Sequence, residues 1–337
     1  MDIEKLIELG NSGDVEAMEE LAERYFWGIE VQENDEQAFY WYSLAAAKGS
    51  SIGYNGLGNC YRIGAGVMPD AVKAFENYEK ASQTGSPEGD YNLANCYIAG
   101  VGVEQDTKKA MTLLLRAADG GIADAAVLAG MNLIYGEVVP QDTEKGFEYL
   151  QMAMQAQTPA AFAAMGECYR DGLGVEADID TAIDLFEMAA ELHYPDAFTE
   201  LIYIHDRDLS DVKPNDERAF FWCKRAADIT GDPQFNSMLA LYYYEGRGTE
   251  VNKLEAMRRM SMVAAMGDET SYVILAQWSC EMKDYEGTAY WMEQVHNSLY
   301  WKGSEYIVEA NPLTEATYRY YKAIGDDAAA AKWNRGF

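Results

Sequence analysis

A repeat with a period of 36 residues runs along this chain and limits its fold more than any other feature. Tyr25, Tyr61 and Tyr97 are separated by 36 residues, and Tyr169 lies 72 residues further on, with Leu133 halfway between. Small residues keep the same period, followed by two steps of 37, at Ala38, Ala74, Ala110, Gly146, Ala182, Ala219 and Ala256. Periods of this length are typical of solenoids, in which each repeat buries its apolar face against its neighbours.

A glycine-rich turn follows the tyrosine position in several repeats. It occurs at Gly64–Gly66, Gly100–Gly102, Gly172–Gly174 and Gly246–Gly248. The second copy is followed by Lys108 and Lys109 and could be taken for a phosphate-binding loop. A phosphate site, however, is needed once in a domain, whereas a turn between two helices is needed in every repeat. We therefore interpret the glycines as the turn within a helix pair, and the two lysines as solvated side chains at a helix start.

Each repeat is predicted to contain two helices. The first spans about residues 17–26 in the opening repeat, where Ala17, Leu21, Ala22 and Tyr25 have helical spacing. The second is preceded by an Asn or Asp, whose side chain accepts hydrogen bonds from the first amides of a helix. These predicted N-caps are Asn34, Asp70, Asp106, Asp142, Asp178, Asn215, Asn252 and Asp284.

These patterns predict an all-α fold, a right-handed α-solenoid of stacked helix-turn-helix repeats with one continuous core and no separate domains. We expect a capping helix in residues 1–12, eight repeats in residues 13–297 and a helical cap in residues 298–337. The eighth repeat lacks the Gly-x-Gly turn, so its assignment has the least support.

The charge of the chain bears on its partners. With 26 basic and 56 acidic residues the formal net charge is -30, which disfavours nucleic acid and anionic membrane surfaces by repulsion. A protein or peptide partner, neutral or basic, is expected. The opening MDIEKLIELG lacks the features of a signal peptide, and no stretch approaches the length of a membrane span. We expect a monomer in the cytoplasm.

The combined pattern resembles the Sel1-like repeat family, a branch of the tetratricopeptide-like solenoids. The resemblance rests on a small residue followed by Leu-Gly/Ala-x-x-Tyr, then Gly-x-Gly-Val, Asp, Lys-Ala and a closing Ala-Ala before glycine, and it covers nearly the whole chain. It implies a non-enzymatic scaffold or adaptor that assembles protein complexes.

One branch of that family is secreted, cysteine-rich and linked to β-lactam binding, with a cysteine pair joining the two helices of each repeat. Here Cys60, Cys96 and Cys168 share one first-helix position and have no cysteine partner in their second helices. Equivalent positions in adjacent repeats are about 10 Å apart, too far for a disulfide. We expect all five cysteines to be free. A β-lactam-binding or enzyme-like member of that branch, and an exported protein with a host or envelope partner, are the alternatives.

Candidate catalytic groups are few. His193 replaces the glycine between repeats, His205 replaces the core tyrosine, and His296 lies on the last second helix. No metal-binding or serine-hydrolase spacing is present. Ser210 and Lys213 match the Ser-x-x-Lys pattern of penicillin-recognising enzymes, but the companion motifs are absent, so we interpret the match as chance. No catalytic residue, cofactor or metal is expected.

A binding surface is predicted on the first helices, which in related solenoids line the concave face. The positions that flank the apolar stripe are Glu16, Glu19, Glu23, Trp27, Asn55, Asn59, Arg62, Glu88, Tyr91, Asn95, Asp124, Met131 and Tyr135. Amides can pair with the backbone of an extended peptide, and carboxylates select lysine or arginine. Asn59 and Asn95 are equivalent positions in successive repeats. The alternative is an ordinary solvated helix surface.

Overall fold

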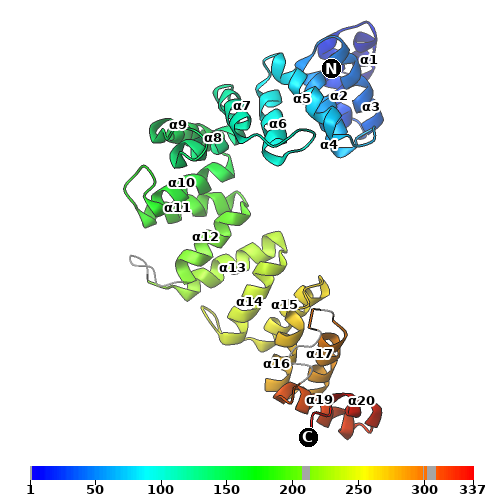
Figure 1. The fold of residues 1–337 in the computed structure, drawn as a ribbon, viewed down its shortest axis with the longest axis vertical. Coiled ribbons are helices and arrows are strands. Elements are labelled where there is room, and N and C mark those ends of the chain that lie inside the picture. Colours follow the sequence, from blue (N-terminus) through cyan, green and yellow to red (C-terminus); the bar gives the residue numbers. More distant parts are fainter. Residues whose placement is uncertain (1, 207–212, 299, 302–308) are drawn as a thin grey trace. The chain divides into compact units, whose positions relative to one another are not determined.

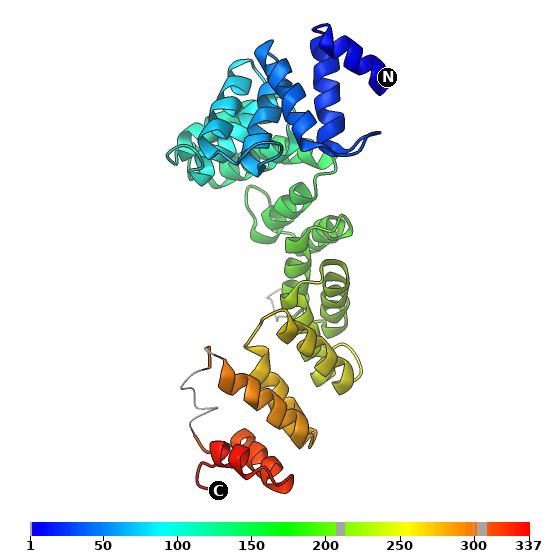
Figure 2. The ribbon, with the colours of Figure 1, turned by 90° about the vertical axis from the view of Figure 1, so that its right-hand side faces the viewer.

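The structure is a computed structural model that describes residues 2–206, 213–298, 300–301 and 309–337. The described residues form α-helices joined by short turns, and no strand occurs among them. They divide into two compact units, unit 1 ending at Leu192 and unit 2 beginning at His193. Each unit is a stack of antiparallel helix pairs (Figure 1 and Figure 2). The chain is thus an α-solenoid, as the repeat predicts.

Unit 1 begins with the capping helix α1, followed by five helix pairs. The capping helix and the first helices of the pairs are α1 (Ile3–Asn11), α2 (Val15–Trp27), α4 (Ser51–Ile63), α6 (Pro87–Ala99), α8 (Ala123–Tyr135) and α10 (Pro159–Asp171). The second helices are α3 (Asp35–Ala47), α5 (Ala71–Gln83), α7 (Thr107–Asp119), α9 (Thr143–Gln155) and α11 (Ile179–Glu191).

Unit 2 contains three further pairs and the described C-terminal helices. The first helices are α12 (Pro195–Asp206), α14 (Pro233–Glu245) and α16 (Ser271–Glu281). The second helices are α13 (Asp216–Thr230), α15 (Lys253–Ala265) and α17 (Tyr285–Asn297), and α19 (Pro312–Ala323) and α20 (Asp327–Trp333) follow.

The predicted N-cap position is confirmed in every pair. All eight Asn or Asp residues precede a second helix, and each side chain accepts a hydrogen bond from a backbone amide of the first turn. Substitution of such a cap by alanine typically costs about 1 kcal/mol. The start of each second helix is therefore encoded locally.

The same residue also closes the turn between the two helices. The backbone amide of Asn34 donates to the carbonyl oxygen of Tyr25 at 2.9 Å, and Asp70 does the same to Tyr61 at 2.9 Å. In the sixth pair Asn215 donates to His205 at 2.7 Å. This contact uses only the backbone of the tyrosine position, so histidine can replace tyrosine there without opening the turn.

The tyrosine ring joins neighbouring pairs. The ring of Tyr61 on α4 packs edge-on against Phe39 of the preceding second helix, with centroids 5.6 Å apart. Tyr97 on α6 makes the same contact with Phe75, at 5.5 Å. In these two pairs the tyrosine ring therefore links the pair to the one before it.

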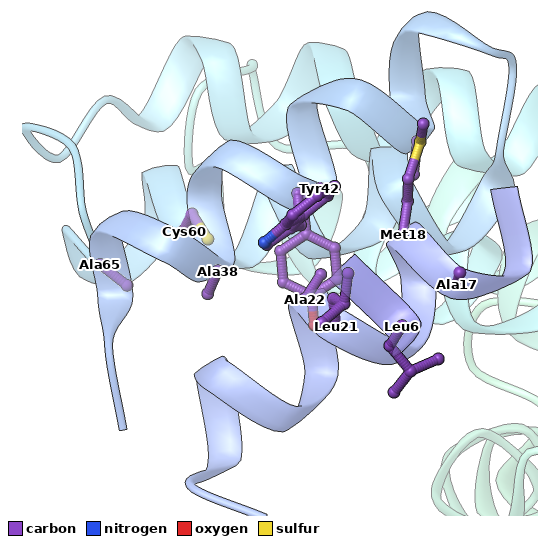
Figure 3. Packing of buried hydrophobic residues seen from close by; sticks show 11 residues of the cluster. Leu6, Ala17, Met18, Leu21, Ala22, Ala38, Tyr42, Cys60 and Ala65 are labelled. Atoms are coloured by element: carbon purple, nitrogen blue, oxygen red, sulfur yellow. The ribbon is translucent and has the colours of Figure 1, made fainter. Parts of the chain in front are cut away.

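Small residues let the helices approach closely. All seven predicted small positions on the second helices are buried, as at Ala38, Ala74 and Ala110. At Gly53 a methyl group would come within 2.4 Å of the backbone nitrogen of Ala46 on α3. Figure 3 shows the result at the N-terminal end, where Leu6 and Leu21 pack with Tyr42 in one apolar cluster.

The second glycine of the turn is also a packing position. Gly102 has a φ of +73°, and a methyl group added to it would lie 2.1 Å from the carbonyl oxygen of Ala71, at the start of α5 in the preceding pair. In the first pair Glu30 occupies the equivalent position with a φ of +58°. There the preceding helix is α1, not a second helix, so a side chain can be accommodated.

All five cysteines are free thiols, and four of them are buried. Burial raises the pKa of Cys60 and Cys223 to about 12 and that of Cys168 to about 11. Burial also raises the pKa of Cys96 and of Cys280, which is half-buried.

Thiol titration tests this arrangement. Under denaturing, non-reducing conditions we expect five reactive thiols. In the native protein at pH 8 we expect one to react quickly, because thiolate formation is suppressed at the buried positions. Cys280→Ser should remove the fast phase, and Cys96→Ser should leave it unchanged. Fewer than five thiols after denaturation would contradict the free state.

Candidate functional site

The predicted binding residues lie on one set of helices in unit 1, namely α2, α4, α6 and α8. Because these helices repeat with a period of 36 residues, equivalent side chains form rows across the stack. One row contains Glu23, Asn59, Asn95 and Met131. None of the thirteen predicted residues is buried, so all are accessible to a partner. Seven are exposed, namely Glu16, Glu23, Trp27, Arg62, Glu88, Asp124 and Tyr135, and six are half-buried, namely Glu19, Asn55, Asn59, Tyr91, Asn95 and Met131.

The chemistry of the rows changes along the stack. The row that starts at Glu19 on α2 continues as Asn55 on α4, Tyr91 on α6 and Val127 on α8. The row of Glu23 likewise passes through two amides to a methionine. We call the surface that carries the thirteen residues the first-helix face. In these two rows it changes from carboxylates at α2, through amides and a tyrosine at α4 and α6, to apolar side chains at α8, whereas Glu88 on α6 and Asp124 on α8 are further carboxylates.

The structure brings three of the predicted residues around one hollow. Glu23 from α2, Asn55 from α4 and Glu88 from α6 line a space of about 420 Å³. Its remaining walls are Ser51, Ile52, Thr84, Gly85, Ser86 and Pro87. These wall residues were not predicted. The turn between α5 and α6 carries no chemical motif, and only its place beside the first-helix rows could have indicated it.

Two of the predicted amides already have partners within the chain. The side-chain oxygen of Asn59 accepts a hydrogen bond from the hydroxyl of Tyr78 on α5 at 2.8 Å, and Tyr78 is itself buried. The side-chain oxygen of Asn55 accepts from the amide of Asn92 on α6 at 2.8 Å. Each of these oxygens therefore keeps one lone pair for a peptide amide, so the predicted pairing with a peptide backbone stays a prediction. Asn59 also supports the core.

The carboxylates of α2 differ in their surroundings. Glu20 pairs with Arg24 at 2.6 Å, and Glu19 accepts from the hydroxyl of Ser50 at 2.5 Å. Glu23 forms no ion pair with any described residue, and its pKa is raised by burial and by the neighbouring charges of Glu19 and Glu20. On the other side of the hollow, Glu88 accepts from the hydroxyl of Ser86 at 2.9 Å. The hollow thus has two carboxylates in its lining and no cationic residue.

The histidines have structural surroundings. His193 is exposed and has a φ of +63°, which fits its place in the turn between repeats. His205 is buried, and neither ring nitrogen has a hydrogen-bond partner among the described residues. Burial and, to a smaller extent, the charge of Arg218 lower its pKa to about 4. Such a ring is neutral at physiological pH and lies in the core.

The remaining candidate features concern metal binding, the Ser-x-x-Lys match and the membrane. Within the described ranges, no three His, Cys, Asp or Glu side chains are placed to hold a metal ion. Ser210 of the Ser-x-x-Lys match lies outside the described residues. In the part of the chain that the structure describes, no helix has the length and apolar character needed to cross a bilayer.

A second hollow, of about 480 Å³, lies in unit 2 between Cys280, Tyr285 and α19, where no repeat pattern predicted one.

Comparison with known families agrees with the repeat. The Sel1 repeat model matches seven segments, at residues 15–50, 51–86, 87–122, 123–156, 159–194, 203–229 and 233–268. The chain belongs to the Sel1 repeat family. Each of the first three matched segments contains one helix pair of the structure, from α2 and α3 to α6 and α7. Helices α16 and α17, the eighth predicted pair, lie beyond the last matched segment.

Solved structures of Sel1 repeat proteins have the same fold. A Sel1 repeat protein from Oxalobacter formigenes is 26% identical, with a TM-score of 0.62 over 82% of this chain and 79% of its own. The c5321 protein of uropathogenic Escherichia coli, described as a protective antigen, is 22% identical, with a TM-score of 0.61 over 97% of this chain and 69% of its own. No curated protein sequence matches this Sel1 repeat chain. Sel1 repeat proteins are generally non-enzymatic scaffolds for protein interaction.

Proposed function

We propose that this Sel1 repeat protein is a monomeric, non-enzymatic adaptor of the cytoplasm that binds an extended segment of a partner protein along its first-helix face. The observation that carries the proposal is the set of accessible side chains that α2, α4, α6 and α8 hold in register. Repeated rows of this kind present binding groups at regular intervals, which suits a chain that lies across the helices.

The order of chemistry along the face suggests an orientation for the bound segment. Basic residues would lie over α2, where Glu16, Glu19 and Glu23 gather, since opposite charges steer and align a partner. An apolar side chain would lie over α8, beside Met131 and Tyr135. The net charge of -30 supports a basic protein segment over nucleic acid or an anionic membrane.

The cysteines favour this function over a β-lactam-binding one. The cysteine-rich branch is defined by pairs that join the two helices of a repeat, whereas Cys60, Cys96 and Cys168 are buried and free. Thiols that persist unpaired are typical of a reducing compartment, which supports the cytoplasmic location.

Charge removal on α2 tests the function. Replacing Glu16, Glu19 and Glu23 by glutamine is expected to weaken binding of the captured partner about tenfold at low salt and less at high salt, because salt screens exposed charges. Glutamine keeps an acceptor for the hydroxyl of Ser50, so folding should be unchanged. The measurement is calorimetric titration at two ionic strengths with a partner isolated by affinity capture.

A matched control separates this effect from net charge. Glu36 on α3 and Glu76 and Glu79 on α5 are exposed carboxylates of second helices, and their replacement by glutamine makes the same change of charge elsewhere. The control variant should bind as the unaltered protein does. Equal affinities for both triple variants, with folding intact, would show that the partner uses another surface.

A further inference from the structure

We propose that the hollow between α2, α4 and α6 is a socket for one lysine or arginine side chain of the bound segment, and that this contact sets where the segment begins on the face. The inference rests on the proposed function and refines it, because it assigns one residue type of the partner to one place. Glu23, Asn55 and Glu88 would surround the charged end of that side chain.

The polar lining favours a cation over an anion. Two carboxylates face the hollow from different helices, and no lysine or arginine lines it. The start of α6 could attract an anion through its free amides, but the hydroxyl of Ser86 already accepts from the amide of Gly89 at 3.1 Å. That hydroxyl also donates to Glu88, so the helix end and the carboxylate are joined. A cation therefore has acceptors available, and an anion has no cationic partner.

The surroundings of Glu23 also favour a cation in the hollow. Its carboxylate lies near Glu19 and Glu20, and its pKa is raised first by partial desolvation and then by the repulsion of these two charges. Glu20 is compensated by Arg24, and no described cation compensates Glu23. A guanidinium or ammonium group in the hollow would relieve the repulsion, because an opposite charge within about 4–6 Å favours the ionised form.

The apolar walls and the size fit a long side chain. Ile52 and Pro87 provide an aliphatic lining against which the methylene groups of lysine or arginine can pack. A space of about 420 Å³ is at the small end of ligand sites, which run from about 300 to 1,000 Å³. The hollow therefore has room for one extended lysine or arginine side chain.

Nuclear magnetic resonance with capped tripeptides tests the socket directly. The probes are acetyl-Ala-Xaa-Ala-amide with arginine, lysine, citrulline or norleucine at the central position, and the signal is the methyl resonance of Ile52, assigned with Ile52→Val. We expect saturable shifts with arginine and lysine, and at least tenfold weaker binding with citrulline and norleucine. Citrulline keeps the shape of arginine without its charge, so it isolates the ionic contribution.

Variants and a second cation complete the test. Glu23→Gln with Glu88→Gln should weaken arginine tripeptide binding about tenfold, and Glu36→Gln with Glu76→Gln on the second helices should leave it unchanged. Spermidine, a cation without a peptide backbone, should bind no more tightly than the arginine tripeptide.

Three results would overturn the socket: no shift with any tripeptide, equal shifts with arginine and norleucine, or spermidine binding tenfold more tightly than the peptides. None of them would overturn the proposed function. That function is judged by partner affinity in the triple glutamine variant of α2, so the two failures are distinguishable.

Discussion

Replacing Gly102 by alanine is expected to lower the free energy of unfolding by about 3 kcal/mol or more. Two costs combine at this position. A residue with a side chain is disfavoured at a φ of +73°, by roughly 1–2 kcal/mol. The new methyl group would also lie 2.1 Å from the carbonyl oxygen of Ala71, and backbone at a helix start cannot move away cheaply. Urea unfolding followed by circular dichroism measures the loss, and hydrogen exchange should locate it at α5 to α7.

Two other turn glycines, Gly100 and Gly174, serve as controls because they separate the conformational cost from the packing cost. Gly100 has a φ of +68°, and its nearest neighbour would be 3.7 Å away, so Gly100→Ala should show only the conformational cost. Gly174 is equivalent to Gly102, but its added methyl group would meet the side chains of Thr143 and Phe147 at 3.0 Å or more. Gly174→Ala should therefore be intermediate. Equal losses for all three variants would contradict the packing role of the second glycine.

Acid should destabilise unit 2 through His205. Its pKa in the folded protein is about 4, below the ordinary value of 6.5, so between these pH values the unfolded chain binds a proton that the folded chain does not. The contribution of His205 to stability is therefore complete above about pH 6.5 and is lost progressively as the pH falls toward 4. Between pH 7 and pH 5 the loss from this group is about 2 kcal/mol.

Substitution of His205 should remove that share of the acid sensitivity. Tyrosine and leucine occupy the equivalent position in other repeats, so His205→Tyr and His205→Leu are the variants of choice. Each should lose about 2 kcal/mol less than the unaltered protein between pH 7 and pH 5, as measured by urea unfolding at both pH values. His193→Asn is the control, because asparagine tolerates a positive φ and His193 is exposed. If the His205 variants keep the full pH dependence, the buried ring is not its source.

The helices and their boundaries could be predicted from sequence because the relevant interactions are local. An N-cap such as Asp70 bonds to amides two and three residues away, and a turn glycine such as Gly100 needs only its own backbone freedom. A period that repeats these signals adds independent evidence with every copy. The exposure of Glu23 and Trp27 follows from the same helical spacing.

The site could be predicted only in part because its contacts cross between helices. Glu23, Asn55 and Glu88 are separated by more than thirty residues, and their common hollow depends on how far α2, α4 and α6 lie apart. The bond from Tyr78 to Asn59 joins a second helix to a first helix, and no spacing in the sequence reports it. The sequence therefore predicts where polar side chains lie on an exposed helix surface, but not which residues they contact.

The closure of the helix turn has a practical consequence for this protein. The first helix ends shortly after the tyrosine position, and the second begins at the N-cap. A backbone hydrogen bond joins the N-cap residue to the residue at the tyrosine position. Asn34 lies nine positions after Tyr25, whereas Asn215 lies ten positions after His205, and the same backbone hydrogen bond closes both turns. The number of residues between the tyrosine position and the N-cap can therefore change without changing how the two helices pair. An epitope, a fluorophore or a protease site inserted between the second glycine, such as Gly102, and the N-cap, such as Asp106, should therefore leave the core of the solenoid intact.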